Sequence, residues 1–148
     1  MPSDTNAPIG ESPETAPEFF VDECLSQRWV AEELRNLGAI VHTIRDVFPP
    51  GTIVTDEEWL AMCGTRGWVG LTKDKNIRHR QNERRALRSA KVRVFVLIAR
   101  KAVSGPDQGK VFGKALKRMR EIITTTAPPF IASVDRVGHV ELLKLSDD

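Results

Sequence analysis

The sequence holds few of the residues from which thiol and imidazole sites are built. Its two cysteines, Cys24 and Cys63, lie inside apolar patterns rather than at the short spacings of metal ligands. We therefore expect both to be small core residues that stay reduced in the cytosol. The three histidines, His42, His79 and His139, are scattered and belong to no motif. Neither a zinc site nor a histidine-based catalytic set is predicted.

Long hydrophobic runs are also missing. No apolar stretch approaches the roughly 20 residues that span a bilayer, and the N-terminus lacks the basic-then-apolar order of a secretory signal. We expect a soluble, cytoplasmic protein with no membrane partner. Residues 1–18 hold four prolines and almost no large apolar side chains, which predicts a flexible N-terminal tail. Residues 19–148 are then long enough for one domain with one core.

Positive charge is concentrated in one part of the chain. Of the 22 Lys and Arg residues, 17 lie between Arg66 and Arg120, together with only three of the 20 acids. Because the net charge of the whole chain is only +2, the remaining residues are strongly acidic. A basic half attracts a polyanion, whereas an acidic half repels it. Bound metal ions commonly reconcile the two.

Strand and helix patterns alternate along the chain. Ser26 and Thr55 are predicted N-caps of two helices, and residues 45–55 and 104–109 are predicted to be a loop and a turn. We expect strands over 19–23, 39–44, 68–72, 93–99, 129–135 and 139–145, and helices over 27–37, 56–66, 76–90 and 111–123. This order predicts a three-layer α/β/α sandwich with a mainly parallel sheet and right-handed crossovers.

Three acids fall where such a fold binds ligands, at the carboxyl ends of its strands. Asp22 closes the first predicted strand and Asp74 the third. Asp56 opens the helix before the third strand, and its spacing from the apolar Trp59 and Leu60 turns it inward. Gathering three carboxylates costs several kcal/mol of repulsion and desolvation, which a hard divalent cation removes. We therefore predict a Mg²⁺ or Mn²⁺ site, with Glu57 or Glu23 as a candidate fourth ligand.

Each of these acids also has an ordinary structural explanation. Asp56 alone fits the acid that commonly opens a helix, where it interacts with the helix dipole. Asp22 or Asp74 alone fits a turn after a strand. The metal site accounts for all three positions together, so we favour it.

Basic residues flank Asp74 on both sides. Lys and Arg on helices usually form a solvated face, and residues 110–120 fit that description. The cations next to Asp74 differ, because they lie at the mouth of the predicted cleft. We expect four of them to bind RNA phosphates and to offset charge during phosphoryl transfer: Lys73, Lys75, Arg78 and Arg80.

Three stretches of the chain resemble the motifs of PIN-like domains, over about residues 19–100: FFVDECLSQRWVAEELRNLG, TDEEWL and WVGLTKDKNIR. They contain the D-E-x-L-S strand end, the D-x-E-x-[IWL] helix start and the L-T-x-D strand end. The resemblance is to toxins of the VapC type from bacterial toxin–antitoxin pairs. It implies an endoribonuclease that uses Mg²⁺ or Mn²⁺ to activate water, with Asp22, Asp56 and Asp74 as catalytic and metal-binding acids.

The resemblance also implies partners and shows one departure. Such toxins are typically homodimers, and a small antitoxin protein neutralises them by inserting its tail, often with an arginine, into the acidic cleft. Many PIN domains carry a glutamate in a middle helix and another acid after the fourth strand. Here VRVFVLIARKA ends in Arg100 and Lys101, which leaves a second metal and the fourth acid open.

Other functions are compatible with the same residues. A catalytically inactive PIN-like module would bind nucleic acid through its arginine helix, with a steep dependence on salt. A protein-interaction module would use the acids only as a receptor for arginine. A response-regulator receiver also gathers aspartates at strand ends, but the expected phospho-acceptor is missing and the basic half would have no role.

Overall fold

The alternation of strands and helices is confirmed in the computed structural model, which describes residues 16–145. The strands within these residues are β1 (Glu18–Val21), β2 (Ile40–His42), β3 (Val69–Thr72), β4 (Arg93–Leu97), β5 (Phe130–Val134) and β6 (Val140–Leu143). The helices are α1 (Gln27–Asn36), α2 (Ile44–Val47), α3 (Asp56–Arg66), α4 (Gln81–Ala90) and α5 (Gly105–Thr125). Most of the predicted tail, residues 1–15, lies outside the described residues.

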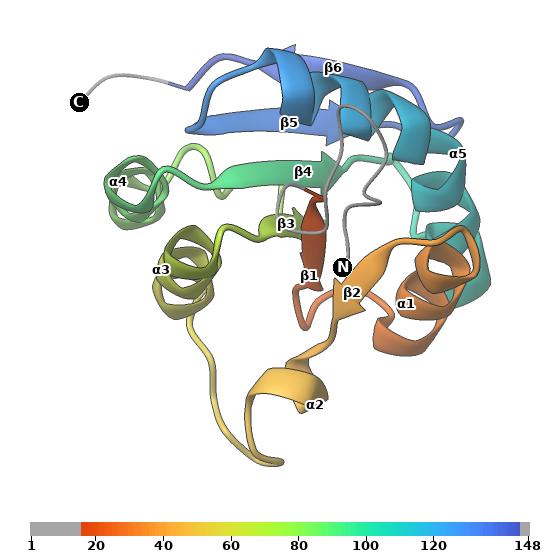
Figure 1. The fold of residues 1–148 in the computed structure, drawn as a ribbon, viewed down its shortest axis with the longest axis horizontal. Coiled ribbons are helices and arrows are strands. Elements are labelled where there is room, and N and C mark those ends of the chain that lie inside the picture. The colour runs from red at the N-terminus through yellow and green to blue at the C-terminus, as the bar shows by residue number, and fades with distance from the viewer. Residues whose placement is uncertain (1–15, 146–148) are drawn as a thin grey trace, which may run out of the picture.

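The strands form one sheet in the order β2-β1-β3-β4-β5-β6. All neighbours pair in parallel except β5 and β6, which form an antiparallel hairpin at the edge of the sheet. In Figure 1, α1 and α5 lie on one side of the sheet and α3 and α4 on the other. Each pair packs on its own cluster of buried side chains, because successive strand residues face opposite sides. The predicted α/β fold with a mainly parallel, helix-flanked sheet is confirmed.

The crossovers do not all have the same hand. The connections β3–α4–β4 and β4–α5–β5 step across the sheet in the same direction, but α4 and α5 cover opposite faces. The prediction that all crossovers are right-handed is therefore wrong for β4–α5–β5, whose hand is opposite to that of the other three crossovers. The connections on either side of α5, residues 98–104 and 126–129, are long enough to permit this route. On its face α5 packs against α1.

The helix expected over residues 76–90 begins only at Gln81, because residues 76–80 form turns. Two further differences from the predicted helices reflect local capping. Residues 104–109 were expected to form a turn, but Ser104 caps α5 by accepting a hydrogen bond from the Asp107 N–H. Pro106 is tolerated there because the first turn of a helix has no use for its missing N–H. Within the predicted loop 45–55, the short helix α2 forms on a capping box between Thr43 and Asp46. No helix in the described part of the chain is long and apolar enough to cross a membrane.

The buried face of α3 agrees with its sequence pattern. Trp59, Leu60 and Cys63 are all buried. Gly67 ends the helix in the left-handed conformation, so that the chain turns directly into β3. The prediction that Cys24 is a core residue is wrong, because it is exposed in the turn after β1. That turn lies at the carboxyl edge of the sheet.

Candidate functional site

The point where the strand order reverses lies between β1 and β3. From β1 the chain continues to β2 on one side, and β3 later adds on the other side. Ligands of open α/β sheets bind at such a point, outside the carboxyl ends of the strands. Asp22 directly follows β1, and Asp74 comes two residues after β3. The fold therefore brings these two acids to the same crevice.

Thr72 connects Asp22 with Asp74. Its hydroxyl donates to Asp22 Oδ2 at 2.7 Å, and its Oγ1 accepts the Asp74 N–H at 3.1 Å. Asp22 is only 7% exposed, and its backbone N–H continues the ladder to Leu71. The threonine of the L-T-x-D stretch thus orients one carboxylate directly and the other through its backbone.

Cys24 adds a second contact to Asp22. The Cys24 Sγ lies 3.0 Å from Asp22 Oδ2 and 3.3 Å from Thr72 Oγ1. Although the residue is exposed, the local burial of its sulfur raises the pKa of the thiol to about 11, and the charge of Asp22 adds to this shift. At neutral pH the protonated thiol donates to the carboxylate, so it is not a reactive thiolate.

Asp56 is fixed by the first turn of α3. Its Oδ1 accepts the Trp59 indole N–H at 2.9 Å, which turns the carboxylate inward as the spacing predicted. The indole ring lies against Gly70, where an added Cβ would come within 2.5 Å of Trp59 Cζ3. Only glycine in β3 leaves room for this ring. Glu58 instead forms a capping box with Thr55 on the exposed side of the helix.

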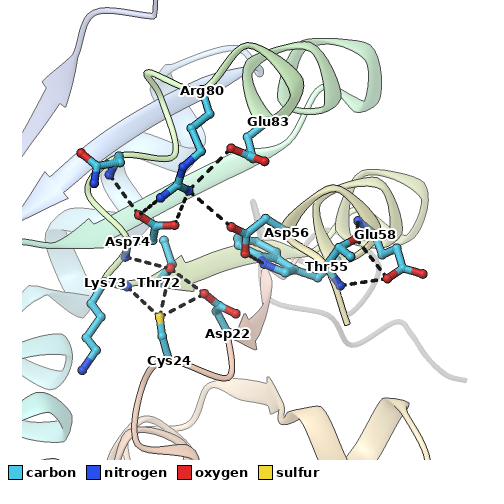
Figure 2. A network of polar contacts seen from close by, with 12 residues as sticks. Asp22, Cys24, Thr55, Asp56, Glu58, Thr72, Lys73, Asp74, Arg80 and Glu83 are labelled. Carbon is cyan, nitrogen blue, oxygen red and sulfur yellow. Dashed lines mark hydrogen bonds and ion pairs between the residues drawn. The ribbon is translucent and has the colours of Figure 1, made fainter. Parts of the chain in front are cut away.

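Arg80 lies among the acids, as Figure 2 shows. Its Nη1 is 2.6 Å from Asp74 Oδ2, 3.7 Å from Asp56 Oδ2 and 3.6 Å from Glu83 Oε1. Asp74 also accepts from Nη2 at 3.4 Å, in a bidentate arrangement, and from the Asn76 N–H at 3.1 Å. Acids from β3's end, α3 and α4 therefore share one guanidinium, a side chain that the sequence suggested for phosphate binding.

Glu83 is a site residue that sequence reasoning missed. Its side chain is 13% exposed, and its buried Oε1 has no hydrogen-bond partner. Burial raises the pKa of Glu83, and the charges of Asp56 and Glu57 act in the same direction while Arg80 opposes them. A usable signal existed, because Glu83 is the one acid in the arginine-rich stretch 76–90. Glu57, the predicted fourth ligand, is exposed and lies near enough to influence Glu83.

The other predicted phosphate-binding residues point elsewhere. Lys73 extends away from the carboxylates in Figure 2 and lines a small cavity at the edge of the sheet. Lys75 lines the same cavity, and both lysines are exposed. Arg78 donates from Nη1 to the carbonyl of Lys144 at 3.2 Å, on the outer side of the hairpin. Lys73 and Lys75 are therefore placed beside Asp74, while Arg78 holds the C-terminal segment.

The acids fit a hard divalent cation by their chemistry. Carboxylate oxygens are the ligands that Mg²⁺ and Mn²⁺ prefer, and the buried Oε1 of Glu83 accepts no hydrogen bond, although it lies 3.6 Å from Arg80 Nη1. The guanidinium of Arg80 at this position indicates that the cluster favours positive charge. Within residues 16–145, no three acidic, histidine or cysteine side chains lie close enough together to coordinate one ion in this arrangement.

Asp22 carries a charge that folding disfavours. Burial raises the pKa of Asp22, and the nearby Asp56 charge adds to the effect, although hydrogen bonds from Cys24 and Thr72 oppose it. A carboxyl group with a raised pKa contributes stability that is present below the pKa of the unfolded chain, about 3.9, and is lost as the pH rises through the folded pKa. At neutral pH, without a bound cation, ionised Asp22 therefore destabilises the fold.

Replacing Asp22 with Asn is expected to raise the free energy of unfolding at pH 7 in EDTA. The gain over wild type should shrink as the pH falls toward 4, because the wild-type carboxyl then becomes neutral. Urea unfolding across this pH range measures the difference. Asp46 is the matched control, since hydrogen bonds from Thr43 lower its pKa and Asp46→Asn should lose stability at pH 7. A destabilised Asp22→Asn would contradict the electrostatic assignment.

The fold and the acids at its switch point define a class, that of α/β domains with a carboxylate site at the sheet edge. A sequence profile described as "PIN like domain" matches residues 17–99, more than half of the chain. The chain therefore belongs to the PIN-like domain family, as its motifs suggested.

One curated relative extends the comparison. Over 79 residues the chain is 36% identical to the protein named "Putative ribonuclease VapC45" of Mycobacterium tuberculosis. The similarity covers 52% of this chain and 57% of that protein, so the chain spans little more than half of its relative's length. No solved structure matches the chain.

Proposed function

We propose that this protein is a metal-dependent endoribonuclease and the toxin of a type II toxin–antitoxin pair. The observation that carries the proposal is the arrangement of acids at the switch point: Asp56 and Asp74 lie around Arg80, and Thr72 links Asp22 to Asp74. Family membership and the ribonuclease named among the relatives support it. Its substrate would be RNA and its compartment the cytoplasm.

In this proposal the chain supplies the ligands and the phosphate contacts. Asp22, Asp56 and Asp74 would hold Mg²⁺ or Mn²⁺, with Glu83 or Glu57 as a further carboxylate. When bound, the ion supplies a Lewis acid that lowers the pKa of water and offsets the charge of the scissile phosphate. Thr72 would hold Asp22 and Asp74 in position relative to each other. Lys73 and Lys75, which line the cavity next to Asp74, would bind phosphates of the same strand.

The proposed partners follow from the same arrangement. Asp56, Asp74 and Glu83 hold the guanidinium of Arg80, and the same acids would hold an antitoxin arginine that displaces it. Such a partner would block both the metal and the RNA. We propose a small antitoxin protein of this kind, and a homodimer as the active form.

The test is the metal requirement and the chemistry of the product ends. Purified protein is incubated with single-stranded RNA and Mn²⁺, Mg²⁺ or EDTA. We expect cleavage only with a divalent ion, and no 2′,3′-cyclic phosphate ends, because water attacks instead of the ribose 2′-hydroxyl. As a control, the variant Glu32→Gln, which removes an exposed carboxylate from α1, should cleave like wild type.

Two outcomes would reject the proposal. Cleavage that persists in EDTA, or that leaves cyclic phosphate ends, would indicate a metal-independent nuclease. RNA binding without any cleavage would favour the alternative, a catalytically inactive nucleic-acid-binding or protein-interaction module.

A further inference from the structure

A second set of charged side chains lies beside the acids, at the carboxyl ends of β4 and β5. Two adjoining cavities of about 190 and 560 Å³ share Lys75, Arg100 and Lys101 in their linings. Lys73 lines the smaller cavity and Arg136 the larger one. We call these two cavities together the basic groove. Its cations come from three separate loops, which follow β3, β4 and β5.

The cations of the basic groove lack internal partners. All five are exposed, and within residues 16–145 none of them forms an ion pair: Lys73, Lys75, Arg100, Lys101 and Arg136. Like charges held near one another repel, at about 1 kcal/mol for a pair 4 Å apart in water. An anionic ligand that spans the three loops would relieve this repulsion. A row of such cations focuses the field along the groove.

The floor of the groove has a different character from its rim. Ile98 and Ala99 line both cavities, and each is only half-buried at the end of β4. An apolar floor below a cationic rim suits a ligand with flat apolar groups and regularly spaced negative charges. A nucleic acid strand has both, because its bases and sugars alternate with phosphates. An acidic peptide offers the charge but lacks flat apolar groups beside it.

The groove lies next to the acidic site along the chain. Lys73 and Lys75 flank Asp74 directly in the sequence and also line the groove. Adjacent strands lie about 4.8 Å apart, and β3 to β5 therefore spans about 10 Å, the length of a few nucleotides. Asp135, on the far rim, accepts hydrogen bonds from the backbone N–H groups of Val137 and His139.

We infer that the basic groove is a substrate-binding subsite for single-stranded RNA, with Arg100 and Lys101 as its principal phosphate ligands. The inference rests on the proposed function for the position of the scissile phosphate, which lies at Asp74. The strand runs from there across the ends of β4 and β5, with sugars and bases over Ile98 and Ala99. Arg100 and Lys101 thus bind the nucleotides that flank the cleaved bond.

Fluorescence anisotropy with a labelled 12-nucleotide oligouridine tests the subsite, with EDTA present to prevent cleavage. Arg100→Gln/Lys101→Gln is expected to bind about 20-fold more weakly than wild type at 0.1 M salt. The slope of log K against log salt should fall by about 1.4, since each phosphate contact on a single strand contributes about 0.7. Lys114→Gln/Lys117→Gln, an equal charge change on the exposed face of α5, is the control and should bind like wild type.

The outcomes separate this inference from the nuclease proposal. Unchanged affinity and slope in Arg100→Gln/Lys101→Gln would overturn the subsite even if metal-dependent cleavage stands. The expected loss of binding in a protein that never cleaves would support the subsite and reject the nuclease. Wild type that does not bind the oligouridine at low salt, or that prefers a poly-glutamate peptide, would overturn the subsite and assign the groove to another ligand.

Discussion

Replacing Asp74 with Asn is expected to lower kcat/KM for metal-dependent RNA cleavage about 1,000-fold, which corresponds to about 4 kcal/mol of transition-state stabilisation. The amide oxygen can still accept the Asn76 N–H, and the backbone N–H can still donate to Thr72, so the local turn should persist. The variant loses the negative charge and, with one oxygen replaced by NH₂, the bidentate pair with Arg80. That charge is the part of Asp74 that a divalent cation requires.

The measurement is single-turnover cleavage of a labelled RNA by matched preparations, with circular dichroism to verify the fold. Glu32→Gln again serves as the charge control. If Asp74→Asn keeps more than about a tenth of wild-type activity, then Asp74 is not a metal ligand. In that case the turn-forming role of Asp74 after β3 would be its whole function.

Replacing Arg80 with Gln is expected to tighten Mn²⁺ binding about tenfold, or about 1.4 kcal/mol. In the structure the guanidinium neutralises Asp56, Asp74 and Glu83 together, and a cation entering the cluster would face its repulsion. Because the Arg80 side chain is 46% exposed, solvent screens this repulsion, and the expected gain in affinity is modest.

Titration calorimetry with Mn²⁺ measures the change in affinity. Arg78→Gln is the matched control, since it removes the same charge two residues away but contacts the Lys144 carbonyl and none of the acids. Weaker Mn²⁺ binding by Arg80→Gln would mean that Arg80 organises the carboxylates instead of competing with the ion. Loss of the predicted contact between Arg80 and an RNA phosphate would appear separately, as a higher KM of Arg80→Gln for RNA.

The main features of the fold could be predicted because they depend on local patterns. β1, which Asp22 follows, is marked by its apolar run, and the helices that begin after Ser26 and Thr55 are marked by apolar periodicity and by these caps. The side on which α5 packs could not be predicted in this way. Its apolar stripe fits either face of the sheet, and contact with α1 determines which one it covers.

The candidate site was only partly predictable for the same reason. Strand ends identify Asp22 and Asp74, since parallel strands bring their carboxyl ends to one edge. The partners of Arg80 depend on how α4 and its preceding turn approach α3, and no sequence spacing encodes that contact. Cys24 was assigned to the core from its apolar neighbours, but the turn after β1 places it at the edge, against Asp22.

The most direct measurement is the thermal and urea stability of wild type and Asp22→Asn with Mn²⁺ in place of EDTA. An ion at 100 times its dissociation constant stabilises the folded state by about 2.7 kcal/mol. Mn²⁺ should therefore stabilise wild type strongly and Asp22→Asn little, which reverses their order in EDTA. If Mn²⁺ stabilises neither protein, or both equally, then the carboxylates at the end of β1 and around Arg80 do not hold a divalent cation.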